Sequence, residues 1–316
     1  MKNQTKIKEF VLLGFTESHN LEIFLFALFF IMYFMTVTGN LLIIIITLMD
    51  FHLRTPMYFF LRHYAILEIG YTSAVIPTTL INLASGRKTI SYAGCVSQSF
   101  LYFFLGTTDF FLLTVMSFDR YVAICHPLRY TAIMNDHFCT LLVVLSWIGG
   151  FTLVFGQTMH FLQFPFCGSN VINHFFCDTS PLHKLLCGDT RILDLISFIS
   201  AVFSLLGTLA VTVVFYMKII STVLRIPTAA SRQKAFSTCA AHITVVSITY
   251  GSCISMYVKP LQEDGQDFNK AVAVLNNVVC PLMTPFVYSL RNKQVQNALK
   301  NAFDCKIVFN KMQSVS

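Results

Sequence analysis

The sequence predicts an all-α membrane protein, a seven-transmembrane helix bundle with a short C-terminal amphipathic surface helix. Two observations carry this prediction. Hydrophobic residues make up 55% of the 316 residues and charged residues only 12%, with a mean hydropathy of +0.66, which is not the composition of a water-soluble domain. In addition, seven apolar runs reach the roughly 20 residues that cross a bilayer as a helix. We expect a single domain, with a tail at 1–22, the bundle at 23–290 and a second tail at 291–316.

Four of the runs carry no charge, at 23–49, 195–217, 235–258 and 271–290. Three others each contain an ionisable side chain. The run 56–83 holds Arg62, His63 and Glu68, the run 96–118 holds Asp109, and the run 138–166 holds His160. Segments of this length suit helices, which satisfy their own backbone in lipid, better than the roughly ten-residue strands of a membrane barrel.

The basic residues predict the orientation of the bundle. With the N-terminus outside, Lys and Arg outnumber Asp and Glu on the cytoplasmic segments, whereas the two kinds balance outside. The net charge of +7 is therefore assigned to membrane topology, and nucleic-acid binding has no separate support. Residues 1–22 lack a signal-peptide core, so the first span is expected to act as its own insertion signal. The tripeptide NQT makes Asn3 a glycosylation acceptor in this outer tail.

Cysteine positions agree with this topology. Four of the ten cysteines fall on outer segments, where two disulfides are expected and three pairings are possible: Cys95, Cys167, Cys177 and Cys187. After the last span, Val295, Leu299 and Phe303 recur every four residues, which predicts an amphipathic helix on the cytoplasmic membrane surface. Cys305 just beyond it is either acylated or a free thiol.

Enzyme signatures are missing from the sequence, which has no phosphate-binding glycine loop, HExxH, CxxC or G-x-S-x-G motif. Cys239 and His242, one turn apart, fit either a metal pair or a packed core pair, and the second is favoured. Ionisable groups within spans are costly and usually face an interior. Glu68 and Asp109 therefore either share a cation or proton, or hydrogen-bond neighbouring polar side chains. A channel or transporter would also use such acids, but we find no inverted halves.

Asp119 and Arg120 lie side by side at the inner end of the third span, and the surrounding residues are distinctive. The informative stretches are GN at Gly39, LRTPMYFFL from Leu53, MSFDRYVAICHPLRY from Met116, KAFSTCAAH from Lys234 and PLMTPFVYSLRN from Pro281. Together they resemble class A, rhodopsin-like G-protein-coupled receptors, and within them the tetrapod-type odorant receptors, over essentially the whole chain.

The resemblance implies roles for individual residues. The matching G-protein switch residues are Asp119, Arg120, Tyr121, Tyr216, Pro285 and Tyr288. The implied disulfides join Cys95 to Cys177 and Cys167 to Cys187, and Glu68 with Asp109 matches an acid pair that can hold sodium, the one cofactor considered. Here the two acids are exchanged in length, and Thr284 stands where many relatives have Asn, which weakens the sodium assignment.

For ligand binding, the resemblance points to the outer halves of the third, fifth, sixth and seventh helices. The predicted pocket residues are Tyr102, Phe103, Gly106, Thr107, Ser200, Ser204, Tyr250, Cys253, Ile254, Tyr257 and Asn277. Such a lining suits a small, neutral, volatile molecule. The implied protein is a receptor and not an enzyme, and it activates an olfactory-type stimulatory heterotrimeric G protein and raises cyclic AMP. The implied location is the plasma membrane of olfactory sensory neuron cilia.

Overall fold

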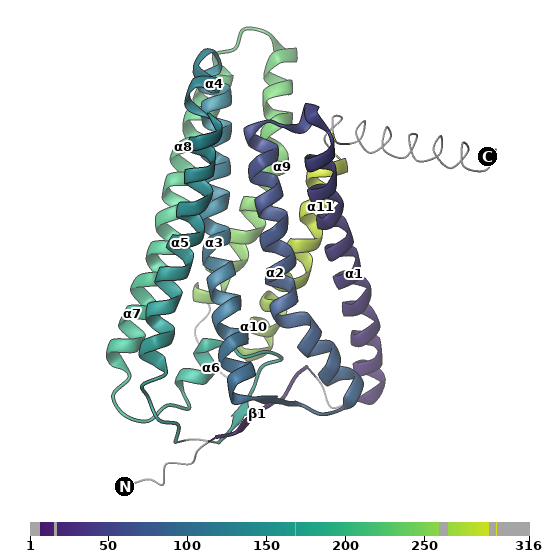
Figure 1. Ribbon diagram of the computed structural model, residues 1–316, viewed down its shortest axis with the longest axis vertical. Coiled ribbons are helices and arrows are strands. Elements are labelled where there is room, and N and C mark those ends of the chain that lie inside the picture. Colours follow the sequence, from purple (N-terminus) through teal and green to yellow (C-terminus); the bar gives the residue numbers. More distant parts are fainter. Residues whose placement is uncertain (1–6, 16–17, 168, 259–264, 291–294, 296–316) are drawn as a thin grey trace, which may run out of the picture.

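The computed structural model describes residues 7–15, 18–167, 169–258, 265–290 and 295, and its described part contains seven helices long and apolar enough to cross a membrane (Figure 1). The first four are α1 (His19–Met49), α2 (Pro56–Ser85), α3 (Tyr92–Cys125) and α5 (Asp136–Phe161). The fifth span joins α7 (Arg191–Ala201) to α8 (Thr208–Leu224) through a π-helical turn. The sixth is α9 (Ala229–Val258), and the seventh joins α10 (Gly265–Val274) to α11 (Cys280–Leu290) through a second π-helical turn.

The seven predicted spans are confirmed, although several helices are longer than the apolar runs from which they were predicted. The helix α1 begins at His19 and α3 continues to Cys125, whereas α5 ends at Phe161, short of the predicted residue 166. Hydropathy marks only the part of a helix in hydrocarbon, and helices continue into the headgroup region with polar residues. The predicted C-terminal amphipathic helix, Asn3 and Cys305 lie outside the described residues, apart from Val295, which is buried.

A small three-stranded sheet closes one end of the bundle, and the sequence did not suggest it. The strand β1 (Glu9–Leu12) lies in the middle, antiparallel to β2 (Thr89–Ser91) and parallel to β3 (Val171–Ile172). The N-terminal tail is therefore held between the segment that precedes α3 and the long segment between α5 and α7, at the bottom of Figure 1. The disulfides Cys95–Cys177 and Cys167–Cys187 lie in this region, which we call the disulfide-bonded end.

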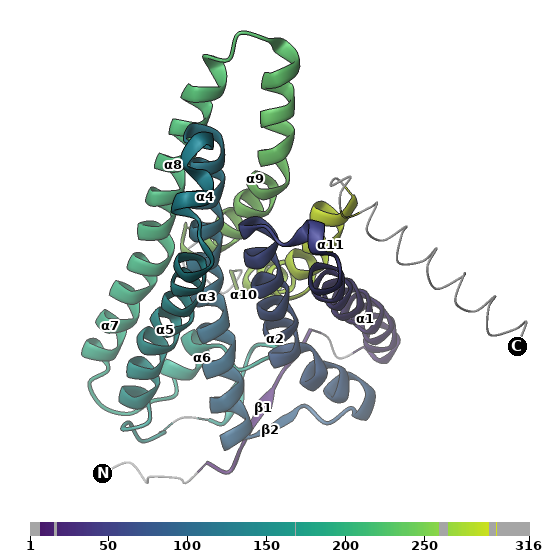
Figure 2. The ribbon, with the colours of Figure 1, turned by 45° about the horizontal axis from the view of Figure 1, so that its top comes forward.

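The interior centres on α3, which Figure 2 shows among α2, α5, α8 and α9. Close approach to α5 depends on Gly150, because a Cβ there would lie 2.1 Å from the Thr108 hydroxyl oxygen. At the outer surface the pattern is reversed from that of a soluble protein: Phe34 is 61% exposed and Phe198 62% exposed. Lipid accounts for these exposed apolar side chains.

The short helices lie at the two ends of the bundle. The helix α4 (Tyr130–Ile133) follows α3 through a 3-10 turn at Pro127–Arg129, and α6 (Thr179–His183) lies in the segment between α5 and α7. Asp119 and Arg120 are thus at the end of α3 opposite the disulfides, whereas α6 is at the disulfide-bonded end (Figure 1). The two regions that the sequence singles out for ligand and partner are at opposite ends of one helix.

Candidate functional site: a polar pocket and an arginine switch

Asp119 and Arg120 form an ion pair in a buried position. The Arg120 Nε donates to Asp119 Oδ2 at 3.0 Å, a second guanidinium nitrogen donates to the same oxygen, and the Tyr130 hydroxyl donates to Asp119 Oδ1 at 2.7 Å. Asp119 is fully buried and Arg120 is 8% exposed. Each carboxylate oxygen therefore has a partner, and the arginine is held against α3. The adjacent acid and base are a neutral, closed unit in this state.

The next layer toward the membrane centre connects α8 with α9. The Tyr216 hydroxyl is hydrogen-bonded to Nδ1 of His242, which is fully buried. Cys239, one turn away on α9, packs with Ile219 and Val223 of α8 in an apolar cluster. Cys239 and His242 thus take part in helix packing, as favoured from the sequence. The side chain of Tyr288 lies outside the described residues, and Pro285 lies against Gly39 of α1.

Glu68 and Asp109 come together in the middle of the bundle. The Thr284 hydroxyl donates to Glu68 Oε1 at 3.2 Å, and the Tyr64 side chain interacts with both carboxyl groups. Within the described residues, Asp109 Oδ1 is buried and has no hydrogen-bond partner. The two carboxyl groups, one of them with an unsatisfied oxygen, and the Thr284 hydroxyl are hard oxygen donors, the ligand type that alkali and alkaline-earth cations prefer.

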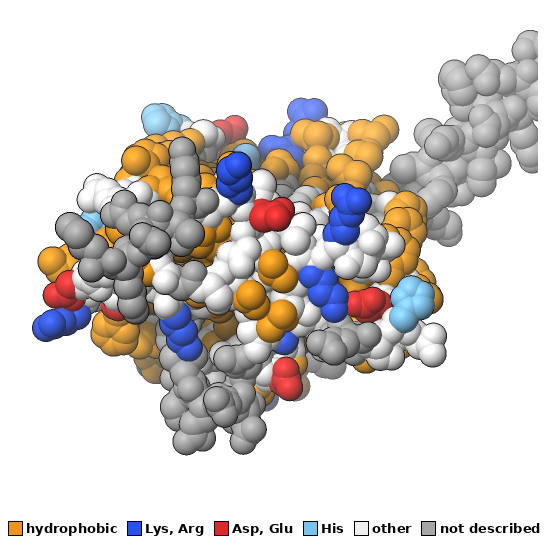
Figure 3. Space-filling model, turned by 90° about the horizontal axis from the view of Figure 1, so that it is seen from below, with side chains coloured by type: hydrophobic (Ala, Val, Ile, Leu, Met, Phe, Trp, Pro, Cys, Tyr) orange, Lys and Arg blue, Asp and Glu red, His pale blue; other side chains and the backbone are white. Residues whose placement is uncertain are grey.

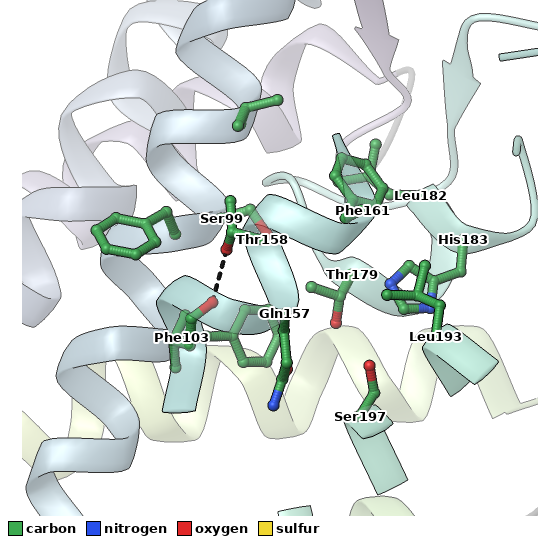
Figure 4. Close-up of a pocket in the computed structure, with 13 residues that line it drawn as sticks. Ser99, Phe103, Gln157, Thr158, Phe161, Thr179, Leu182, His183, Leu193 and Ser197 are labelled. Carbon is green, nitrogen blue, oxygen red and sulfur yellow. Dashed lines mark hydrogen bonds between the residues drawn. The ribbon is translucent and has the colours of Figure 1, made fainter. Parts of the chain in front are cut away.

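A pocket opens at the disulfide-bonded end, between α3, α5, α6 and α7 (Figure 4). Its walls are apolar, with Phe103 and Phe161 among them, and several polar side chains reach it. Figure 4 shows the hydroxyls of Thr179 and Ser197 pointing toward each other, with the Gln157 side chain beside them. The polar lining residues are Ser99, Gln157, Thr158, Thr179, His183 and Ser197. This combination of apolar walls and a few hydrogen-bonding groups is typical of small-molecule sites.

Two of the polar lining residues are already held by other contacts. The Thr158 hydroxyl donates to the Val154 carbonyl at 2.9 Å, the dashed bond of Figure 4, and His183 Nδ1 is 3.1 Å from Asp194 Oδ1. The Thr190 hydroxyl donates to the other oxygen of Asp194 at 3.0 Å. These contacts hold Thr158 and His183 in place in the structure without a ligand.

The predicted pocket residues fall mostly beside this pocket rather than in it. Of them, Phe103 is among the described residues that line it. Tyr102 stacks on Tyr71 and packs against Phe176, with ring centroids 5.0 and 4.7 Å apart, and Gly106 faces Tyr71. The Tyr250 hydroxyl donates to Thr208 at 2.9 Å.

The other predicted positions are divided between packing and helix contacts. Ser204 donates to the carbonyl of Ser200 at 2.8 Å, Cys253 accepts from Asn276, and Asn277 donates to the Ala273 carbonyl. Thr107 is half-buried, Ile254 packs on the core, and the side chain of Tyr257 lies outside the described residues. These positions stay a prediction. The sequence reasoning missed Gln157, Thr158, Thr179 and His183, although polar residues at the outer end of an apolar run were a usable signal.

The long segment between α5 and α7 is tied down next to the pocket. Its disulfides join Cys95 to Cys177 and Cys167 to Cys187, which confirms the pairing that the resemblance implied. The Cys177 amide also donates to Gln98 Oε1 at 3.0 Å, and Gln98 in turn donates to the Ala74 carbonyl at 3.1 Å. These bonds therefore fix the position of this segment relative to α2 and α3.

The comparisons with known proteins agree with this architecture. The family model described as "Olfactory receptor" matches residues 29–306. The mouse protein Olfactory receptor 6E1 is 54% identical over 95% of this chain and 96% of its own length, and the human Olfactory receptor 6C76 is 51% identical over the same shares. Squid rhodopsin shares the fold, with a TM-score of 0.67 at 15% identity, over 92% of this chain and 87% of that one.

Both the extent and the level of these matches are decisive. The relatives are olfactory receptors, which are G-protein-coupled receptors and not enzymes, and the similarity runs from the first span to beyond the last. Together with seven membrane-spanning helices, it makes this chain a multi-pass membrane receptor of class A. The chain belongs to the olfactory receptor family.

Proposed function

We propose that this receptor binds a small, neutral, volatile molecule in the pocket between α3, α5, α6 and α7, and that binding activates a stimulatory heterotrimeric G protein and raises cyclic AMP. The observation that carries the proposal is that the pocket and the arginine switch lie toward opposite ends of the same helix, α3. Ser99 and Phe103 line the pocket near the start of α3, and Arg120 forms its ion pair near the other end of this helix. A ligand that alters the packing of α3 acts on both.

The chemistry of the pocket supports a neutral ligand that carries an oxygen function. The walls supply dispersion contacts, and the hydroxyl and amide groups can donate or accept hydrogen bonds. His183, the lining residue that can become charged, already faces the Asp194 carboxylate. An alcohol, aldehyde, ketone or ester of few carbons fits this lining better than an ammonium ion.

Activation is a shift between two populations of the bundle. A ligand that binds the active arrangement more tightly changes the equilibrium by the ratio of its two affinities, and each tenfold preference corresponds to about 1.4 kcal/mol. In the active arrangement Arg120 leaves Asp119 and turns to the G protein. Leu128, 98% exposed in the turn after α3, adds an apolar contact for that partner at the same end.

The acid pair in the bundle centre is proposed to hold a sodium ion in the inactive state. Glu68, Asp109 and Thr284 would supply the oxygens, and the ion would offset one of the two negative charges of carboxylates that otherwise repel each other. Its contribution is to hold α2, α3 and α11 in the closed arrangement. The proposal includes the plasma membrane of olfactory cilia, with the disulfide-bonded end and Asn3 outside.

The decisive test measures cyclic AMP in cells that express this chain with an olfactory-type stimulatory G protein, during a screen of small oxygenated volatiles. Two variants with matched surface expression are compared with the natural chain. Gln157→Leu keeps the volume of the pocket and removes its amide, so the response should need at least about tenfold more ligand. Arg120→Ala should abolish the response. An unchanged response in both variants would reject the pocket and the switch.

A further inference from the structure

A second polar region lies at the disulfide-bonded end, next to Phe176, which packs against Tyr102. The segment His174–Phe175–Phe176 is buried there, with His174 3% exposed and its ring 4.5 Å from that of Phe176. The N-terminal tail closes over it, because the Gly14 amide donates to the His174 carbonyl at 3.2 Å and Phe15 stacks on Phe175. The position is thus fixed from two sides.

The hydrogen bonds of His174 determine which ring nitrogen carries the proton. The Phe176 amide donates to Nδ1 at 3.4 Å, so Nδ1 is an acceptor and the proton of the neutral ring is on Nε2. Burial, reinforced by the charge of Lys270, lowers the pKa of His174 to about 3, so the ring is neutral at physiological pH. Nε2 is buried and has no hydrogen-bond partner among the described residues. It is a donor without an acceptor.

Lys270 brings a positive charge to the same place. It lies three residues before Ala273, and Ala273 and Val274 pack in one apolar cluster with Phe175 and Phe176, so this face of α10 meets the buried segment. Lys270 is only 8% exposed. In the described part of the chain the acid nearest its ammonium group is Asp267, at 3.9 Å, and the Asp267 side chain is 97% exposed and therefore well hydrated.

We propose that the Lys270 ammonium group and the His174 Nε2–H group form a binding site for a small monovalent anion, with chloride as the reference ligand. An anion there satisfies a buried donor and balances a buried cation, two groups that are costly to leave uncompensated. The recognition is local, since Figure 3 shows basic and acidic side chains interspersed on this end of the molecule rather than one large basic surface. The site would connect the buried segment between α5 and α7 to α10.

The test uses the full chain in lipid nanodiscs and needs neither an odorant nor a G protein. The melting temperature is followed while chloride replaces gluconate, which is too large for the site, at constant ionic strength. The natural chain should gain stability with a saturable chloride dependence. Lys270→Gln and His174→Phe should weaken the apparent chloride affinity at least about tenfold, because each removes a donor to a charged group. Lys184→Gln, a change at an exposed lysine in the same segment, is the matched control.

Each alternative gives a different result. If a water molecule satisfies Nε2, the natural chain shows no chloride dependence, and the proposal is rejected. If chloride acts through general screening, all four proteins respond equally, which rejects it as well. The chain also has acids of its own nearby in sequence at Glu263 and Asp264, outside the described residues. A chloride dependence that arises only in the E263Q/D264N variant would assign the site to these carboxylates and overturn binding of a free anion.

Discussion

The contact between α3 and α5 offers a sharp test, since both helices line the proposed odorant pocket. Replacing Gly150 by Ala places a Cβ 2.1 Å from the Thr108 hydroxyl oxygen, 3.1 Å from the Thr108 amide nitrogen and 3.2 Å from the Phe104 carbonyl oxygen. The first distance is about 1.3 Å shorter than the 3.4 Å at which ordinary contact begins. Rotation of one side chain cannot relieve all three contacts, because two of the atoms belong to the backbone of α3.

The helices must therefore separate, and the size of the effect follows from overpacking. Such insertions cost about 1–3 kcal/mol, against a gain of roughly 1 kcal/mol from replacing glycine by alanine within a helix. We expect Gly150→Ala to lower the melting temperature of the purified receptor by a few degrees and to weaken the odorant response, because Gln157 and Thr158 lie on the same helix. The readouts are a thermal melt in nanodiscs and the cyclic-AMP dose response.

Two further variants make the reasoning refutable. Gly156→Ala adds the same methyl group to α5 with no atom within 4 Å, so its melting temperature should equal or exceed that of the natural chain. The double variant Gly150→Ala with Thr108→Ala removes the nearest atom and should recover part of the loss. If Gly150→Ala melts like Gly156→Ala, the close packing of α3 on α5 is wrong.

Three other predictions concern the ends of the bundle. Tyr130→Phe removes the 2.7 Å hydrogen bond to Asp119 and should raise ligand-independent cyclic AMP a few-fold, and an unchanged basal signal would contradict the closed pair as a brake. Because the pKa of His174 is depressed to about 3, the unfolded chain binds a proton first, and stability should fall as pH drops from about 6.5 toward 3, by at most about 1.4 kcal/mol per unit. Melts at pH 7 and pH 5 should show a smaller loss in His174→Phe, and equal losses would refute this account. Replacing both Cys167 and Cys187 by Ser should cost about 2–5 kcal/mol and most surface expression, measured by flow cytometry, and normal expression would show that the bridge is dispensable.

Hydropathy was sufficient for the spans, because each span depends on a local property of the chain, whereas the disulfide pairs followed only from the family resemblance, since the four outer cysteines by themselves allow three pairings. An apolar run must enter the bilayer as a helix, but the closed ion pair of Asp119 and Arg120 is visible only in the structure. The proposed odorant pocket was harder to predict from the sequence. Phe103 was predicted on α3, but Gln157 and His183 reach the site only because the bundle sets α5 and α6 beside it.

The strands and the Lys270–His174 pair show more clearly that contacts between distant segments cannot be predicted from local sequence. The four residues of β1 resemble any short apolar stretch, and nothing in them indicates pairing with segments much later in the chain. Lys270 reads from sequence as an ordinary loop-end lysine, and His174 as a neighbour of a bonded cysteine. Only the packing of α10 against the segment between α5 and α7 brings the two together.

The central position of β1 sets an order for biosynthesis. Val11 pairs with Val171, so one of the first segments to leave the ribosome cannot find its second neighbour until four helices have entered the membrane. At the usual rates of translation, that delay is on the order of ten to thirty seconds. During this time the edge of β1 that later pairs with β3 has no partner, so the tail stays available to chaperones and glycosylation enzymes. The three-stranded sheet is thus completed late, although its central strand is among the first segments to be synthesised.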